Sequence, residues 1–238
     1  MPTAEGAAPF VPKTRNLDRL RRAAATCRGC DLYRRATQTV FGLGAPDARV
    51  VLVGEQPGDQ EDRQGAPFVG PAGDVLRRAL LEAGIPLDKV YLTNVVKHFK
   101  FEERGKRRIH KKPGRTEIVA CRPWLNAELE AIRPDVVVSL GATAAQAIMG
   151  SRFQLMKDRG RFLPTSQAPK LLATLHPSAV LRAPERADRH RLYRLLTADF
   201  RVVASELDGA SRGRARMARK RPASRILVAK GRLATPRG

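Results

Sequence analysis

Four short apolar runs alternate with helical patterns along most of the chain, and this alternation restricts the fold more than any other feature. The first run, Val50–Val53, is uninterrupted and ends at Gly54, which is typical of a strand buried on both faces. Strands that alternate with helices indicate a parallel sheet covered on both sides. We therefore predict an α/β fold, a three-layer α/β/α sandwich with a central four-stranded parallel sheet. The other strands are expected at 90–96, 136–140 and 171–175, and helices at about 72–83, 116–132, 142–149 and 184–205.

The chain is expected to have three parts. Residues 16–205 carry the predicted sheet and helices, beginning with Asn16 as the N-cap of a short helix, and form one domain. Residues 1–15 are an N-terminal extension without the pattern of a signal peptide, and no long apolar span occurs. Residues 206–238 are rich in Arg, Lys, Ala, Gly and Pro with little periodicity, which predicts a disordered basic tail.

The charge of the chain indicates a polyanionic partner. Its 45 Lys and Arg residues outnumber 23 acids, which gives a formal net charge of +22. Nucleic acid is the expected partner, and an anionic membrane surface is the second choice. An intracellular protein keeps its thiols reduced, so its three cysteines indicate metal binding or burial rather than disulfides.

A basic segment ends in a single histidine. Residues 100–115 contain eight Lys or Arg against two acids, and the run Lys106-Arg107-Arg108-Ile109-His110 lies within them. The surrounding cations favour the neutral form of His110, because protonation would add another positive charge. A loop of this kind can hold a phosphate backbone and present a neutral nitrogen as base or nucleophile. A solvated loop with an inert histidine fits the segment equally well.

Polar residues stand at the ends of three predicted strands. Glu55 follows the first, Asn94 lies near the end of the second, and His176 follows the last. The carboxyl ends of parallel strands meet at one edge of a sheet, where open α/β folds bind their ligands. Each residue alone also fits a turn or a structural position, and Phe68 alone fits a core position. Their shared placement predicts one site.

Three cysteines and a histidine are candidate metal ligands. Cys27 and Cys30 come from one C-x-x-C turn, Cys121 comes from the start of a helix, and His98 follows the second strand as the candidate fourth ligand. From spacing alone, zinc, an iron–sulfur cluster and buried thiols without metal remain open.

Five ordered motifs resemble the uracil-DNA glycosylase superfamily, specifically its iron–sulfur branch, which is related to family 4. The resemblance covers about residues 16–203, and the motifs are Gly54-Glu55-Gln56-Pro57-Gly58, Phe68-Val69-Gly70-Pro71-Ala72-Gly73, Thr93-Asn94-Val95-Val96-Lys97, Ala120-Cys121-Arg122-Pro123-Trp124 and His176-Pro177-Ser178. Ordinary members of the branch carry a cysteine where this chain has His98. With Gln56 and the inserted loop that ends at His110, this departure resembles the UdgX subgroup, whose members excise uracil and then become covalently joined to DNA through the loop histidine.

The resemblance implies a role for each matching residue. The implied catalytic residues are Glu55, His110 and His176, and the implied uracil-binding residues are Gln56, Asp59, Phe68 and Asn94. The implied DNA-binding residues are Lys97, Lys106, Arg107, Arg108 and Ser178. The implied ligands of a 4Fe-4S cluster are Cys27, Cys30, His98 and Cys121.

The implied function is excision of uracil from DNA followed by covalent linkage of His110 to C1' of the abasic site. The expected partner is uracil-containing DNA, with single strands preferred, and the protein is expected to be a cytoplasmic monomer that associates with the nucleoid when bound to DNA. Two alternatives remain: a conventional turnover glycosylase that uses water, and a non-catalytic DNA-binding metalloprotein.

Overall fold

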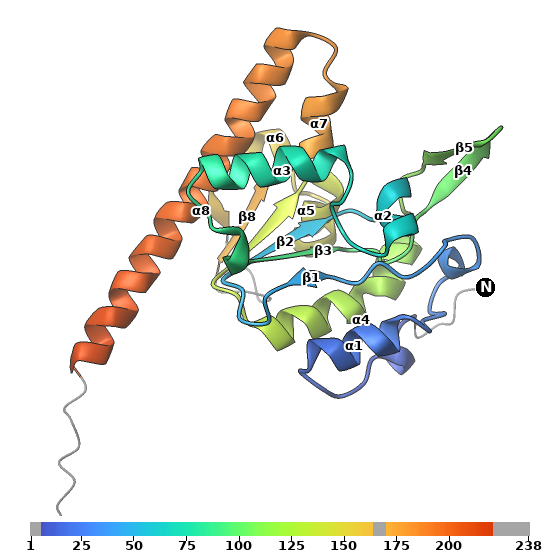
Figure 1. Ribbon diagram of the computed structural model, residues 1–238, viewed down its shortest axis with the longest axis horizontal. Coiled ribbons are helices and arrows are strands. Elements are labelled where there is room, and N and C mark those ends of the chain that lie inside the picture. Colours follow the sequence, from blue (N-terminus) through green and yellow to red (C-terminus); the bar gives the residue numbers. More distant parts are fainter. Residues whose placement is uncertain (1–5, 164–169, 221–238) are drawn as a thin grey trace, which may run out of the picture.

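The computed structural model describes residues 6–163 and 170–220, and a mostly parallel sheet forms its centre (Figure 1). The strand order is β1-β3-β2-β6-β8-β7. The predicted strands are confirmed as the four parallel members β2 (Val50–Gly54), β3 (Val90–Asn94), β6 (Val136–Leu140) and β8 (Lys170–Thr174). Two antiparallel edge strands, β1 (Leu43–Gly44) and β7 (Phe162–Leu163), were not predicted, because two residues are too short to leave a pattern.

Helices cover both faces of the sheet. Alternate side chains of β2 point to opposite faces of the sheet and pack into two separate cores. Val51 and Val53 pack in the cluster that contains Trp124, and Val50 and Leu52 pack in the cluster that contains Leu76. The first face carries α1 (Leu17–Ala24), α4 (Arg115–Ile132) and α5 (Ala142–Met149), and the second carries α3 (Pro71–Glu82), α7 (Pro177–Arg182) and α8 (Arg186–Lys220). Shorter connecting elements are α2 (Asp59–Gln64), α6 (Leu155–Asp158), η1 (Ala8–Phe10), η2 (Asp31–Arg34) and η3 (Leu87–Lys89).

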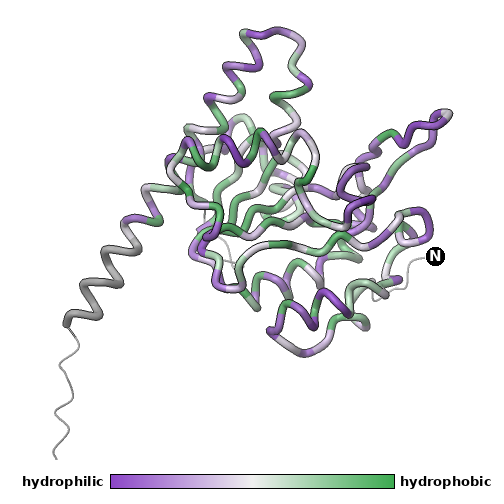
Figure 2. Tube along the Cα trace, viewed as in Figure 1, coloured by the Kyte–Doolittle hydropathy of each residue, from purple (hydrophilic) through white to green (hydrophobic). Residues whose placement is uncertain are grey.

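The basic segment before α4 forms a hairpin that projects from the body. Strands β4 (Phe101–Arg104) and β5 (Arg107–His110) pair antiparallel, and Gly105 at the tip has a φ of 58°. The hairpin is coloured mostly as hydrophilic in Figure 2. Strands are recognised in a sequence by alternating apolar and polar residues, a pattern that arises when one face is buried. The hairpin has no continuous buried face, so a loop was predicted there.

The two ends of the chain correct the predicted boundaries. The extension before residue 16 is not separate from the domain, since the Ala7 backbone N–H donates to the Ala120 carbonyl at 2.8 Å and Ala7 is buried. The predicted disordered tail from residue 206 is wrong for residues 206–220, which continue α8. Arg and Ala are strong helix formers even without an apolar stripe. Residues 221–238 of the predicted tail lie outside the described residues.

No helix in the described part of the chain is long and apolar enough to cross a membrane.

A buried ion pair joins the end of β3 to α4. Lys97 and Glu128 are 1% and 0% exposed, and the Lys97 ammonium also donates to Thr93 Oγ1 at 2.6 Å and to the Asn94 carbonyl at 2.8 Å. The Glu128 carboxylate accepts from Tyr91 Oη at 3.1 Å, and this carboxylate and burial raise the Tyr91 pKa. A buried charge is tolerated only when it is paired and hydrogen-bonded in this way. The prediction that Lys97 contacts DNA phosphates is therefore wrong.

We predict that Glu128→Ala lowers the free energy of unfolding by about 3–5 kcal/mol, because it leaves the Lys97 ammonium buried without a counter-charge. The control is Glu130→Ala on the same helix, where the lost ion pair with Arg15 is exposed and contributes less than about 1 kcal/mol. Denaturant unfolding of both variants measures the difference. Equal stability of the two variants would contradict this role of the buried pair.

Candidate active site

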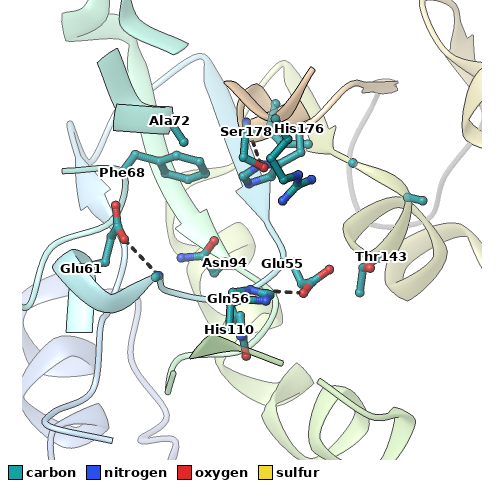
Figure 3. Close-up of a pocket in the computed structure, with 15 residues that line it drawn as sticks. Glu55, Gln56, Glu61, Phe68, Ala72, Asn94, His110, Thr143, His176 and Ser178 are labelled. Atoms are coloured by element: carbon teal, nitrogen blue, oxygen red, sulfur yellow. Dashed lines mark hydrogen bonds and ion pairs between the residues drawn. The ribbon is translucent and has the colours of Figure 1, made fainter. Parts of the chain in front are cut away.

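A cavity of about 390 Å³ lies at the carboxyl edge of the parallel strands (Figure 3). The residues predicted at three strand ends, Glu55, Asn94 and His176, all line it. His110 reaches it from the hairpin, and Phe68 from the loop before α3. The complete lining is Glu55, Gln56, Gly58, Glu61, Phe68, Ala72, Asn94, His110, Leu140, Gly141, Ala142, Thr143, His176, Ser178 and Arg182.

His110 faces Glu55 across the mouth of the cavity. Its Nε2 lies 3.6 Å from Glu55 Oε1, which is longer than a hydrogen bond. Glu55 Oε1 is buried and accepts no hydrogen bond within the described part of the chain. A buried acceptor of this kind can stabilise a positive charge or receive a proton from a group that enters the cavity.

The surroundings of His110 favour the neutral form of its imidazole. Burial lowers its pKa below the usual value, Glu55 acts in the opposite direction, and the charge of Arg182 lowers it further. A neutral ring keeps one nitrogen lone pair, which a base or nucleophile requires.

Gln56 fastens the base of the hairpin. Its side-chain nitrogen donates to the carbonyls of Lys100 and Lys111 at 3.1 and 3.0 Å, and its oxygen accepts from the Lys100 backbone N–H at 3.1 Å. These bonds join the two residues that flank the paired strands. The Gln56 amide group thus holds the hairpin that carries His110, although the residue also lines the cavity.

Arg108 anchors the other side of the hairpin to α2. Its guanidinium donates to Asp62 at 2.7 Å and also pairs with Asp59, and it lies 5.5 and 5.0 Å from the ring centroids of Phe99 and Phe101. Hydrogen bonds to the two carboxylates raise its pKa against the effect of partial burial. Arg108 was predicted to bind DNA and Asp59 to bind uracil. In the structure the two side chains bind each other and neither lines the cavity, and both roles stay predictions.

Phe68 and Asn94 form a tightly packed wall of the cavity. Both are buried, and a Cβ at Gly54 would lie 2.3 Å from the Asn94 side-chain oxygen and 2.8 Å from the Phe68 ring. Phe68 has a φ of 56°, which is unfavourable for a residue with a side chain. Its carbonyl accepts from Arg77 at 3.0 Å, which helps to hold this conformation. The wall combines an aromatic ring with an amide that can both donate and accept.

Glu61 holds the two loops around this wall together. Its carboxylate accepts from the backbone N–H groups of Gly58 at 3.0 Å and Gly70 at 2.9 Å (Figure 3). It was not among the predicted site residues. Its position three residues after Gly58, the N-cap of α2, is where a glutamate accepts from the N-cap backbone N–H, as in one half of a capping box.

His176 is a hydrogen-bond donor aligned by α7. His176 Nδ1 lies 2.7 Å from Ser178 Oγ and accepts from the Ser178 backbone N–H at 3.2 Å, and a neutral ring that accepts at Nδ1 carries its proton on Nε2. Burial lowers its pKa to about 4, with smaller contributions from Arg182 and His110. The Phe68 and His176 rings are stacked with centroids 6.1 Å apart. His176 can therefore donate to an anion that forms beside Phe68.

Arg182, which was not predicted, supplies the positive charge of the cavity. It is exposed, lines the cavity from the last turn of α7, and pairs with no carboxylate in the residues that the structure describes. Its charge lowers the pKa of both His110 and His176. Lys106 and Arg107 are also exposed, at the hairpin tip, where phosphate contacts are sterically open.

The three cysteine side chains lie in one buried region. The Trp124 indole N–H donates to Cys27 Sγ at 3.2 Å, and the Lys97 backbone N–H donates to Cys121 Sγ at 3.3 Å. Burial raises the Cys121 pKa to about 12, with smaller contributions from Cys30 and Cys27, and it also raises the Cys30 pKa. N–H donors to sulfur stabilise thiolates that bind a metal.

His98 follows Lys97 and is buried. Its Nε2 is 2.9 Å from Thr39 Oγ1, and burial lowers its pKa to about 4, so the ring is neutral and can act as a ligand. Within the described residues, no three His, Cys, Asp or Glu side chains meet as ligands of a single metal ion. The buried thiols, the N–H groups that donate to two of them and the neutral imidazole are the groups that could hold a metal or an iron–sulfur cluster.

Comparison with known proteins gives consistent matches. Residues 41–201 match the model of the uracil DNA glycosylase superfamily. The chain is 41% identical over 157 residues to a type-4 uracil-DNA glycosylase of Thermotoga maritima, covering 66% of this chain and 78% of the relative. It is 33% identical over 196 residues to the type-4 enzyme of Sulfurisphaera tokodaii (79% and 83% covered) and 38% identical over 178 residues to that of Archaeoglobus fulgidus (71% and 85% covered).

We predict that Arg182→Gln raises the pKa of both His110 and His176, because it removes a positive charge that disfavours their protonated forms. NMR titration of the imidazole nitrogens measures both values, and the His176 value should rise from about 4 but stay below that of an exposed histidine, since burial is the larger cause. Arg191→Gln removes an exposed arginine of α8 and should leave both values unchanged. Unchanged values in Arg182→Gln would contradict the assigned electrostatics.

Proposed function

The chain belongs to the uracil DNA glycosylase superfamily, and we propose that it removes uracil from DNA and then becomes covalently joined to the abasic sugar through His110. The observation that carries the covalent step is the position of His110, whose neutral imidazole faces an unpartnered oxygen of Glu55 in the same cavity. The proposed nucleophile and a carboxylate thus lie next to each other in one cavity, where a bound sugar could contact both.

Uracil would be recognised by shape and by hydrogen bonding. The base has to leave the stack to enter the cavity, either from a single strand or by flipping. Phe68 stacks on its ring, and the Asn94 amide pairs with its O4 and N3–H. Cytosine reverses this donor and acceptor pattern, so it would leave buried polar groups unpaired. Gln56 contributes through the hairpin that it fastens.

Cleavage of the glycosidic bond moves its electron pair onto uracil and leaves a cationic sugar. His176 donates its Nε2 proton in a hydrogen bond to the uracil O2 side, which stabilises the leaving anion. Glu55 stabilises the cationic sugar with its buried carboxylate. A His110 ring nitrogen then bonds to C1', and the proton of its other nitrogen is lost to Glu55 or to solvent. The product keeps the new bond between His110 and C1', so the enzyme does not turn over.

A conventional turnover glycosylase is the alternative within the family. The gap of 3.6 Å between His110 Nε2 and Glu55 Oε1 favours it, because the buried Glu55 oxygen could instead orient a water for attack on C1'. In that case His110 only lines the entrance. A DNA-binding metalloprotein without catalysis, the alternative from another class, would release no uracil.

DNA would lie across the mouth of the cavity. Lys106 and Arg107 at the hairpin tip and Ser178 at the start of α7 are the proposed phosphate contacts. We propose single-stranded DNA as the preferred substrate and the monomer as the active form. We also propose that the protein is cytoplasmic, because DNA is its substrate, and that it associates with the nucleoid when it is bound to DNA.

We propose that Cys27, Cys30, His98 and Cys121 hold a 4Fe-4S cluster. The buried thiols and the N–H donors to two of them support this assignment. The cluster would tie the segment after α1 to the turn after β3 and to α4, which stabilises the surface around the cavity. No step of uracil excision needs it.

Incubation with single-stranded DNA that contains one uracil should produce a covalent adduct. We expect a heat-stable band of higher mass on a denaturing gel, only with uracil-containing DNA, and its loss in His110→Ser because serine lacks the ring nitrogen. Ile109→Ser places the same side chain at the adjacent exposed residue and should keep the band. Uracil release with repeated turnover and no band in the unmodified protein would establish the water-using alternative.

The purified protein should be brown and contain about four iron atoms and four sulfides per chain. Substitution of Cys121 by Ser should reduce the iron content and the thermal stability together, since the cluster joins separate segments. Stoichiometric zinc in the protein purified without air would contradict the assignment. Iron and zinc analysis with visible absorption distinguishes the two metals without an activity assay.

A further inference from the structure

Helix α7 separates the candidate active site from a second cavity. Ser178 and Arg182 line the active-site cavity, whereas Val180 and Leu181 line a cavity of about 830 Å³ between α3, α7 and α8. These three helices pack together at the upper end of the molecule in Figure 1. A helix is about 10–12 Å across with its side chains, so only a short stretch of chain is needed to pass from one cavity to the other.

The floor of this second cavity is apolar and partly aromatic. Val75, Val180 and Leu181 line it, together with Tyr193 of α8. Val180 is buried, but Leu181, the next residue of α7, is 46% exposed. The Arg78 guanidinium lies 4.7 Å from the centroid of the Tyr193 ring. A planar aromatic surface beside exposed leucine is suited to stacking of an unpaired base.

The rim of the second cavity carries a positive charge without an acidic partner. Arg78 and Arg194 are exposed, and neither pairs with a carboxylate within the described residues. Glu82 is the one acid among the lining residues, and its carboxylate accepts from Tyr193 Oη at 2.9 Å and from Arg201 at 3.2 Å. Two guanidinium groups without a carboxylate partner, beside an apolar surface, complement a nucleotide, which has a flat base and an anionic phosphate.

We propose that this cavity binds a neighbouring nucleotide of the same DNA strand when uridine occupies the active site. The strand crosses α7 at Leu181, the neighbouring base rests against Tyr193 and Leu181, and its phosphate contacts Arg78 and Arg194. The inference rests on the proposed function, because only a bound uridine places the strand across α7. The cavity would extend the DNA footprint beyond the excised nucleotide and favour an unpaired strand, since a paired base cannot enter it.

Binding of single-stranded oligonucleotides to the full-length protein tests this inference. A 2'-fluoro-2'-deoxyuridine at the target position keeps uracil in the active site but has a glycosidic bond that resists cleavage, so no adduct forms, and 2-aminopurine is placed at each flanking position in turn. We expect a change in fluorescence at one position. We also expect the Arg78→Gln, Arg194→Gln double variant to weaken binding by about tenfold and to reduce the salt dependence of binding. The control is Arg19→Gln, Arg22→Gln, which removes the same charge from exposed positions of α1 on the opposite face.

Truncation of the oligonucleotide provides the decisive comparison. Removing the nucleotide identified by fluorescence should weaken binding of the unmodified protein and the control, but not of the Arg78, Arg194 variant, because the contact is already lost. Equal losses in all three proteins would overturn the proposal. An effect that arises only after annealing a complementary strand would assign the cavity to that strand and also overturn it. Adduct formation by the unmodified protein is measured separately, so failure of the proposed function is recognised independently.

Discussion

The buried ion pair between Lys97 and Glu128 is the contact on which the active edge of the sheet depends. A charge that is removed from water has to keep its partner, so the turn after β3 and the middle of α4 cannot move apart. Asn94, whose carbonyl accepts from the same ammonium, lies on one side of this contact, and Cys121 accepts from the Lys97 backbone on the other. One pair therefore sets the positions of the Asn94 amide, proposed to bind uracil, and of a candidate cluster ligand.

Much of the fold could be predicted from the sequence because buried parallel strands leave a clear signal. Each of the runs that begin at Val50, Val90 and Val136 forms a strand, and the side chains at their ends meet in one cavity. The hairpin, the course of α8 beyond residue 206 and the roles of Lys97 and Arg108 could not be predicted. A lysine or arginine looks the same in a sequence whether it faces water or a buried carboxylate, and only the packed structure brings Glu128 or Asp62 to it.

The electrostatics of His110 illustrate the same limit. In the sequence, the cations around His110 favour its neutral form and Glu55 opposes it, and the two effects cannot be weighed from the residues alone. In the structure the pKa of His110 is lowered. The main cause, however, is burial, and the cation that contributes is Arg182, which is remote in sequence. Arg108, two residues away, is neutralised by Asp59 and Asp62. The local charge of a segment is thus a poor measure of the field at one of its atoms once other elements pack against it.

The antiparallel register of the hairpin fixes which changes of its length keep His110 at the cavity. His110 pairs with Phe101 at the base of the two strands, and Gln56 fastens the residues that flank this pair. The tip at Gly105 can therefore gain or lose residues while His110 stays at the cavity. A single insertion between the base and the tip would turn alternate side chains to the opposite face. The length of the hairpin and the residue that it presents to the cavity can therefore be changed separately in this chain.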